Sequence, residues 1–267
     1  MKEKIIDGYD IIRYRRWFMQ FPKSFDKLRW EDIKWLAQYY PFKPTTTFYF
    51  KMFIHFCSLK FKPLLAWHVY TRMKPIDIHL IMSNGLQRES EKYLMAWLFK
   101  PLSADEMCLN SFRLNGVNYY APSNELINFL FGDFKWAETA LTSYFKTGDK
   151  AALAIIAAAL YYPSKKARRY DEVALNKRSE LFKKLDMVTL KGIMLNYVAC
   201  RTPIMEDNKV LFEGGSSAGD GEVLTWLDVA NDMAVTAADI DNVNNILTRV
   251  MLSRLSRMKI KAAKAKK

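Results

Sequence analysis

The chain has 267 residues, of which 50% are hydrophobic and 14% aromatic, and this excludes a disordered chain and provides for a sizeable core. It has only 10 glycines and 9 prolines, and apolar residues recur at helical spacing, so we expect helices rather than turn-rich sheets. The net charge of +13 is concentrated at the two ends: residues 1–100 carry 18 basic and 9 acidic side chains, residues 101–248 carry 15 and 19, and residues 249–267 carry 8 and none. Such surfaces attract nucleic acid, acidic proteins or anionic lipid, and charge alone does not choose among them.

The cysteines and the hydropathy of the chain indicate in which cellular compartment the protein is expected. Cys57, Cys108 and Cys200 are isolated and odd in number, which favours a reducing environment over a disulfide framework. The first residues lack the continuous apolar core of a signal peptide. The most apolar run, residues 151–162, would form about 18 Å of helix against a hydrocarbon core of about 30 Å, so we expect no membrane span and a soluble, cytoplasmic protein.

The first hundred residues are predicted to form an aromatic-rich helical subdomain, residues 1–100. Prolines and a glycine separate its expected helices. These are residues 30–40, 46–59, 64–71, 75–83 and 90–99. The second helix is apolar on almost every face and should be central, with His55 as a hydrogen-bonded core histidine.

Residues 101–122 show no sustained period and contain a candidate turn at Asn115 and Gly116, so we expect a connector there. A second helical subdomain is predicted over residues 123–260, followed by a basic tail, residues 261–267. Its expected helices are residues 124–131, 134–146, 150–161, 173–185, 187–200, 222–235 and 239–260. The predicted fold is therefore an all-α, irregular multi-helix bundle with two helical subdomains.

Two helices within this second region are strongly punctuated. Asp133 is predicted to cap the first, Gly148 to close it in the left-handed conformation, Asp149 to cap the second and Pro163 to stop it. Asp186 is a further predicted cap. The second helix sets four large aliphatic residues among six alanines, which predicts a tightly packed element.

No residue pattern forms a catalytic, cofactor-binding or metal-binding signature. The glycines at 214 and 219 have phosphate-loop spacing but lack the lysine that such a loop needs, so the run from 214 to 221 is interpreted as a flexible linker. The three histidines have no ligand partners at metal-site spacing. We therefore expect a protein that is not an enzyme and has no cofactor. A polar pocket containing a carboxylate with a strongly shifted pKa would revive the enzyme hypothesis.

Two basic runs are the candidate partner-binding residues. Lys165, Lys166, Arg168 and Arg169 follow Pro163, and Arg254, Arg257, Lys261 and Lys264 share one face of the last predicted helix. A solvated connector and a solvated helix end explain these runs without any partner. The alternative is contact with an acidic protein or with nucleic acid.

A further pattern is made by residues scattered along the chain. These residues are Phe21, Pro22, Ser24, Phe25, Leu28, Ile33, Leu36, Tyr119, Tyr120, Pro122, Phe134, Ala137, Tyr144, Thr147, Asp149, Leu153, Leu160, Tyr161, Pro163, Trp226, Leu227 and Ala230. Their pattern resembles that of helical proteins encoded in the tail-assembly gene region of Bacteroidota phages and prophages. The family pattern places an arginine between tyrosine and proline, where this chain has Tyr162, so no role of that arginine carries over.

The resemblance implies a non-enzymatic part in tail morphogenesis, either as an assembly chaperone or as a virion component. The implied partners are other phage proteins, chiefly tail components, and the implied location is the host cytoplasm during assembly or the particle. The sequence leaves the oligomeric state open. The alternative hypothesis is a nucleic-acid-binding accessory protein that uses the two basic runs.

Overall fold

The computed structural model describes residues 9–14, 17–43, 45, 47–48, 51–52, 55–56, 98, 100–165, 168–212, 226–234, 236 and 239–265. The chain divides into two compact units, residues 1–28 with 39–102 and residues 29–38 with 103–267. We expected a first subdomain that ended near residue 100. In the structure residues 29–38 belong with the later part of the chain, and so do the residues of the expected connector from 103 onward.

The described part of the first unit starts with an antiparallel hairpin. Strand β1, Tyr9–Tyr14, pairs with β2, Trp17–Pro22, and a short 3₁₀ turn, Phe25–Lys27, follows. Within the helix predicted at 46–59, the described residues 47–48, 51–52 and 55–56 are helical, and the ring of a half-buried His55 meets Phe56 at 5.0 Å between centroids. The predicted helices at 64–71 and 75–83 lie outside the described residues, as does all of 90–99 except Leu98.

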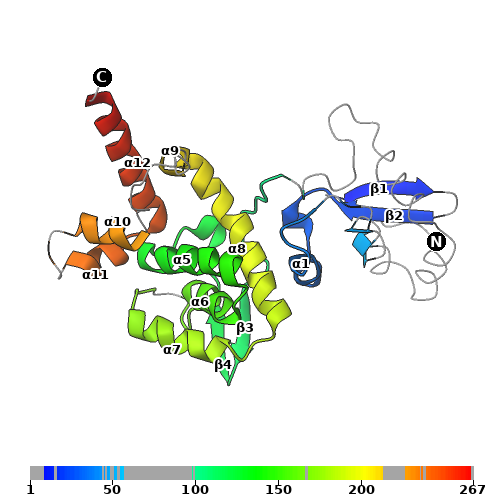
Figure 1. Ribbon diagram of the computed structural model, residues 1–267. Helices are drawn as coiled ribbons and strands as arrows, with labels where there is room; N and C mark the ends of the chain where they lie inside the picture. The colour runs from blue at the N-terminus through cyan, green and yellow to red at the C-terminus, as the bar shows by residue number, and fades with distance from the viewer. Residues whose placement is uncertain are drawn as a thin grey trace. The chain divides into compact units, whose positions relative to one another are not determined.

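The second unit is a helical assembly, shown with its labels in Figure 1. Its helices are α1 Trp30–Ala37, α5 Phe131–Thr147, α6 Lys150–Leu160, α7 Glu172–Phe182, α8 Met187–Asp207, α9 Lys209–Phe212, α10 Trp226–Met233, α11 Asp239–Asn244 and α12 Thr248–Ala265. Helix α6 packs against α5, α7 and α8, and Leu153, Ile156 and Ala157 are completely buried. This confirms the prediction that the alanine-rich segment is a packing element.

Strands are the first departure from prediction, because the chain is mainly helical but not all-α. Strands β3, Ser111–Leu114, and β4, Val117–Tyr120, form an antiparallel hairpin inside the predicted connector. Asn115 and Gly116 join them with φ of 49° and 81°. Two positive φ values match the twist of a two-residue hairpin turn, and Asn followed by Gly is the pair that adopts them most easily.

The predicted helix punctuation is confirmed at most positions. Gly148 closes α5 with φ of 70°, and Asp149 caps α6 by accepting a hydrogen bond from the Ala151 N–H at 2.9 Å. Asp186 caps α8 through the Thr189 N–H at 2.8 Å. The prediction for Asp133 is wrong: α5 begins at Phe131, so Asp133 lies inside the first turn, and its side chain turns into the core.

Helix α8 is longer than predicted because it continues through Pro203. A proline cannot donate the backbone hydrogen bond to the residue four positions earlier, which is Ala199. The Ala104 N–H donates to the Ala199 carbonyl oxygen at 3.1 Å and so replaces the missing donor. A distant segment therefore supports the helix at the position where a proline would otherwise leave a buried carbonyl group unpaired.

The single helix predicted over 239–260 is wrong, since α11 ends at Asn244 and α12 starts at Thr248. The residues between them pair with the chain before α5: the Phe131 N–H donates to the Ile246 carbonyl oxygen and the Thr248 N–H donates to the Phe129 carbonyl oxygen, each at 2.8 Å. These non-local bonds replace the helical bonds at the break. The predicted helix at 124–131 is reduced to a 3₁₀ turn, Asn124–Leu126.

Helix α1 joins the second unit through its contact with α8. A Cβ placed on Gly192 would lie 2.8 Å from the Trp30 ring, so a larger residue there would force the ring to shift. Ile33, Leu36 and Ala37 are buried on the inner face of α1. None of the described helices is long and apolar enough to cross a membrane.

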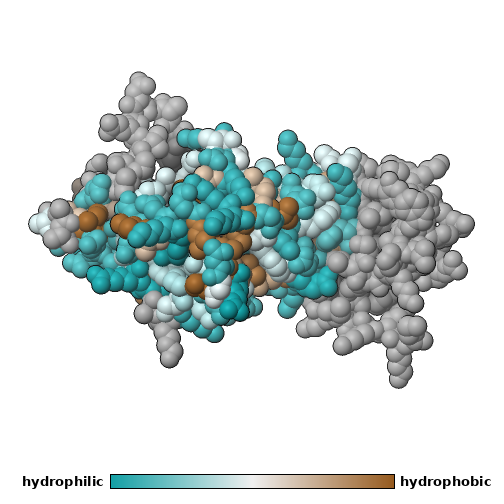
Figure 2. Space-filling model, turned by 90° about the horizontal axis from the view of Figure 1, so that it is seen from below, coloured by the Kyte–Doolittle hydropathy of each residue, from teal (hydrophilic) through white to brown (hydrophobic). Residues whose placement is uncertain are grey.

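Helix α7 and the β3–β4 hairpin form the lower edge of the second unit in Figure 1, and Figure 2 views that side. The described surface is mostly hydrophilic, with apolar residues gathered near the middle of the view. Large apolar side chains exposed on these elements include Val117 of β4 and Val173 of α7.

Candidate functional site

The C-terminal end of α6 is buried, so its last carbonyl groups need hydrogen-bond donors from other parts of the chain. The last carbonyl groups of a helix have no partner within it, and a buried helix end needs donors from elsewhere. Arg168 Nη2 donates to the Leu160 carbonyl oxygen at 2.9 Å and to the Tyr120 carbonyl oxygen at 3.0 Å, and Arg178 Nε donates to the Ala158 carbonyl oxygen at 3.1 Å. Two arginines therefore cap this helix, where a cation is also favoured by the helix dipole.

Both arginines also lie over the ring of Tyr162. The guanidinium carbon is 4.1 Å from the ring centroid for Arg178 and 4.8 Å for Arg168, which is within cation–π range. Burial lowers the pKa of Arg168 to about 10, although the charges of Asp133 and Tyr162 act in the opposite direction. The guanidinium therefore loses solvation and is held by carbonyl oxygens and an aromatic ring.

Asp133 completes this arginine cluster, defined here as Asp133, Tyr162, Arg168 and Arg178. The Tyr162 hydroxyl lies 2.8 and 2.9 Å from the two carboxylate oxygens of Asp133, whose side chain is completely buried. Burial raises the pKa of Asp133 from 3.8 to about 7, against the opposing effects of the Tyr162 hydrogen bond and the two arginine charges. Asp133 is therefore a buried carboxyl group that exchanges its proton near neutral pH.

A cavity of about 800 Å³ lies beside the arginine cluster. Its lining comes from α5, the segment between α6 and α7, the first turns of α7, α10 and α11. The lining residues are Lys135, Tyr162, Pro163, Ser164, Arg169, Tyr170, Asp171, Glu172, Val173, Ala174, Arg178, Asn231, Ile240, Asp241, Asn244 and Asn245. Three basic and three acidic side chains are among them, so the cavity is polar and close to neutral in charge.

Lys135 and Tyr170 form a second polar group in this lining. The Lys135 ammonium lies 5.7 Å from the centroid of the Tyr170 ring, and burial lowers the pKa of Lys135. The Tyr170 hydroxyl accepts a hydrogen bond from Trp136 Nε1 at 2.7 Å and donates to Glu172 Oε2 at 3.3 Å. These bonds hold the wall of the cavity in one arrangement.

The chemistry available to the cavity is limited by access to Asp133. Tyr162 and Arg178 line the cavity, whereas Asp133 does not, and Asp133 is fully buried behind the Tyr162 hydroxyl. Any proton exchanged between Asp133 and a ligand would have to pass through that hydroxyl. The enzyme hypothesis required a polar pocket that contains a carboxylate with a strongly shifted pKa, whereas Asp133 lies behind the cavity wall.

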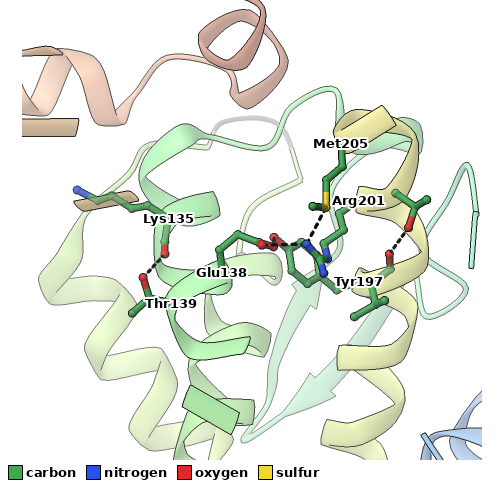
Figure 3. Close-up of polar contacts among 8 residues, drawn as sticks. Lys135, Glu138, Thr139, Tyr197, Arg201 and Met205 are labelled. Carbon is green, nitrogen blue, oxygen red and sulfur yellow. Dashed lines mark hydrogen bonds and ion pairs between the residues drawn. The ribbon is translucent and has the colours of Figure 1, made fainter. Parts of the chain in front are cut away.

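A second buried cluster links α5 to α8 (Figure 3). Glu138 of α5 accepts a hydrogen bond from the Tyr197 hydroxyl at 2.8 Å and forms an ion pair with Arg201 Nη1 at 2.9 Å. Burial raises the pKa of Glu138, and the Arg201 charge and the Tyr197 hydrogen bond oppose this effect. Arg201 Nη1 also lies 2.7 Å from Met205 Sδ. The cluster cross-links two core helices, because removing either charge would leave the other buried and unpaired.

Helix α12 carries the second candidate site. Its inner side is fixed by buried Met251 and Leu252 and by a hydrogen bond of 3.0 Å from Ser256 Oγ to Asn208 Oδ1. Figure 1 shows its C-terminal part extending away from the rest of the second unit. A hollow of about 730 Å³ on its outer side is lined by Arg249, Val250, Ser253, Arg254, Arg257, Met258 and Lys261.

The structure separates the predicted basic residues into two kinds. Arg254, Arg257, Lys261 and Lys264 are exposed along α12, as the helical spacing predicted. The run after Pro163 does not form one surface. Lys165 and Arg169 are exposed, Lys166 lies outside the described residues, and Arg168 turns inward to cap α6.

Sequence reasoning missed Asp133, Tyr162 and Arg178 as a group. One signal was available for an inward arginine: α6 is apolar up to its end, so its last carbonyl groups were bound to be buried and to need donors. Nothing in the linear spacing indicates that Arg178, a residue of α7, would supply one of them.

Among the described residues, no group of three or more His, Cys, Asp and Glu side chains is arranged to hold a metal ion. Comparisons with protein-family models, with curated proteins and with solved structures found no match to this chain.

Proposed function

We propose that the protein is a non-enzymatic binding protein of phage tail assembly that contacts an acidic partner protein through the outer face of α12. The phage assignment rests on the residue resemblance described above. The mode of binding rests on one observation, the exposed basic and apolar face of α12. The proposed partners are tail components, met in the host cytoplasm during assembly or in the particle.

All charged side chains of α12 are basic. Residues 248–265 contain six basic and no acidic side chains. Arg249 is held by Glu125 at 3.3 Å and by Asp207 at 3.6 Å, and Lys259 donates to the Val210 carbonyl oxygen at 2.6 Å. The four exposed cations further along, Arg254, Arg257, Lys261 and Lys264, define what we call the α12 basic face. This face presents positive charge to an outside partner rather than to its own unit.

Apolar side chains on the same side of α12 favour a protein as the occupant. Val250 is 56% exposed and Met258 is 49% exposed, and both line the hollow together with three side chains of the α12 basic face. A phosphate backbone binds cations and gains little from contact with exposed aliphatic groups. A protein interface, in contrast, combines a central apolar contact with a charged rim. An acidic surface with an apolar centre complements both features.

The test compares three variants of the full chain for copurification with tail proteins from infected cells. Arg254→Glu, Arg257→Glu and Lys261→Glu together should abolish copurification, and Val250→Ser with Met258→Ser should weaken it strongly. Lys146→Glu, Lys177→Glu and Lys184→Glu together are the matched control, because these exposed lysines lie on α5, on α7 and in the turn after α7 and should not matter. A lone monomer in infected cells, with normal tails made in its absence, would refute the proposal.

The nucleic-acid alternative keeps one supporting observation, the four exposed cations of the α12 basic face. It loses part of the second basic run, because Arg168 serves α6. A salt titration of duplex DNA binding separates the two functions. If DNA is the partner, log K should fall by about 0.9 per neutralised phosphate for each tenfold rise in salt, the glutamate triple variant should lose binding, and the serine double variant should bind normally.

A further inference from the structure

Two buried polar atoms of opposite type lack a hydrogen-bond partner in the same cavity wall. Arg178 Nη2 is a donor and Asn244 Oδ1 is an acceptor, and neither has a partner among the described residues. The two residues are 9% and 4% exposed, and both line the cavity of about 800 Å³. Buried polar atoms are normally satisfied by protein, water or a ligand, so an unpaired donor and an unpaired acceptor on two residues that line one cavity leave a place for a ligand that serves both.

We propose that this cavity binds a small organic acid that carries an N–H or O–H donor beside its carboxylate, as α-amino acids and α-hydroxy acids do. The carboxylate accepts from Arg178, and the donor serves Asn244 Oδ1. This site is separate from the α12 basic face and does not depend on the function proposed for it.

Arg178 is prepared to receive an oxyanion. Its Nε is fixed on the Ala158 carbonyl oxygen and its guanidinium lies over the Tyr162 ring, so its position is set before any ligand arrives. A preorganised guanidinium gives the strongest hydrogen bonds to a carboxylate. The first turn of α7, from Glu172 to Ala174, also lines the cavity, and the start of a helix favours negative charge.

The acidic side chains of the lining select the other half of the ligand. Asp171 caps α7 by accepting from the Ala174 N–H at 3.0 Å, and Glu172 accepts from the Tyr170 hydroxyl. Together with Asp241 they oppose a ligand that carries only negative charge and favour one that also carries an ammonium group. L-Alanine should therefore bind more tightly than L-lactate, which has a hydroxyl group in its place.

The cavity is large enough for a ligand bigger than L-alanine or L-lactate. These two compounds therefore serve as probes that represent one part of the full ligand. The experiment titrates the full chain with each compound and follows binding by NMR. Propionate is the matched control compound, because it lacks the donor. We expect saturable binding of L-alanine, weaker binding of L-lactate and at least about tenfold weaker binding of propionate.

Two variants locate the binding in the cavity. Arg178→Met removes the carboxylate partner but also removes a cap of α6, so it is paired with Asn244→Leu, which leaves that cap in place. Asn244→Leu should reduce the affinity for L-alanine about tenfold, to the level of propionate. Arg257→Gln, on the α12 basic face, should leave L-alanine binding unchanged, whereas it should weaken the binding of the partner protein to α12.

Three results would overturn the proposal: no saturable binding of either fragment, equal binding of propionate, or L-alanine binding that survives Asn244→Leu. Loss of L-alanine binding in Arg257→Gln, with binding retained in Asn244→Leu, would place the fragment on α12 instead. Failure of this site leaves the copurification test untouched, because the two use different residues.

Discussion

Replacing Asp133 by asparagine should remove a large part of the pH dependence of stability. The pKa of Asp133 rises from 3.8 in the unfolded chain to about 7 in the folded chain, because the carboxyl group is buried. Between these values the folded chain keeps a proton that the unfolded chain has released, so the free energy of unfolding falls as the pH rises. Three pKa units correspond to about 4 kcal/mol, at 1.36 kcal/mol per unit.

The asparagine variant keeps an oxygen that can accept the Tyr162 hydrogen bond but carries no titrating proton. Urea unfolding at pH 5 and pH 8 measures the difference. The wild type should lose on the order of 2–4 kcal/mol more than Asp133→Asn between these two values. Glu138 contributes in the same direction, since its pKa is also raised, and it does so in both proteins.

Glu180→Gln is the control, because Glu180 lies in an exposed ion pair with Lys183 and should leave the pH dependence as it is. Equal loss of stability in the wild type and in Asp133→Asn would refute the argument. It would mean that Asp133 stays ionised in the folded chain, held by the two arginine charges against the cost of burial.

Three further predictions concern packing and turns, and each is checked by urea unfolding. Arg168→Met should lower the free energy of unfolding by roughly 3 kcal/mol, because it leaves buried carbonyl groups at the end of α6 without donors, while Lys165→Met should change nothing measurable; equal values for the two would contradict the inward placement of Arg168. Gly192→Ala should cost about 1–3 kcal/mol, since the new methyl group would meet the Trp30 ring, and a neutral result would show that α1 does not pack there. Gly116→Ala should cost about 1 kcal/mol because alanine resists positive φ, although no side chain blocks the space; a stabilised variant would exclude this turn.

The parts of the fold that sequence predicted are those fixed by local chemistry. Gly148, Asp149 and Asp186 act within one helical turn of their own position, and these predictions are confirmed. The hairpin at Asn115 and Gly116 was predictable by the same kind of reasoning, since its turn pair stands between two short runs of strand-forming residues. It was not predicted because residues 101–122 were interpreted as a connector.

The parts that sequence did not predict depend on partners distant in the chain. The helix predicted to end at residue 200 continues through Pro203, and Ala104 supplies the missing donor from almost a hundred residues earlier. Arg168 appeared to belong to a solvated basic loop, and only the burial of the α6 end turns it inward. The cavity is likewise assembled from segments separated in sequence, so no spacing rule could identify it.

The second unit is discontinuous in sequence, because residues 39–102 are inserted between α1 and the remainder of the unit. During synthesis α1 leaves the ribosome long before α8 exists, so its apolar face has no native surface to cover it. The first unit can be completed in that interval, whereas the second cannot close until most of the chain has been made. Nascent chains that stall after residue 102 should therefore expose Ile33 and Leu36 to chaperones, and release of these residues should coincide with translation of α8.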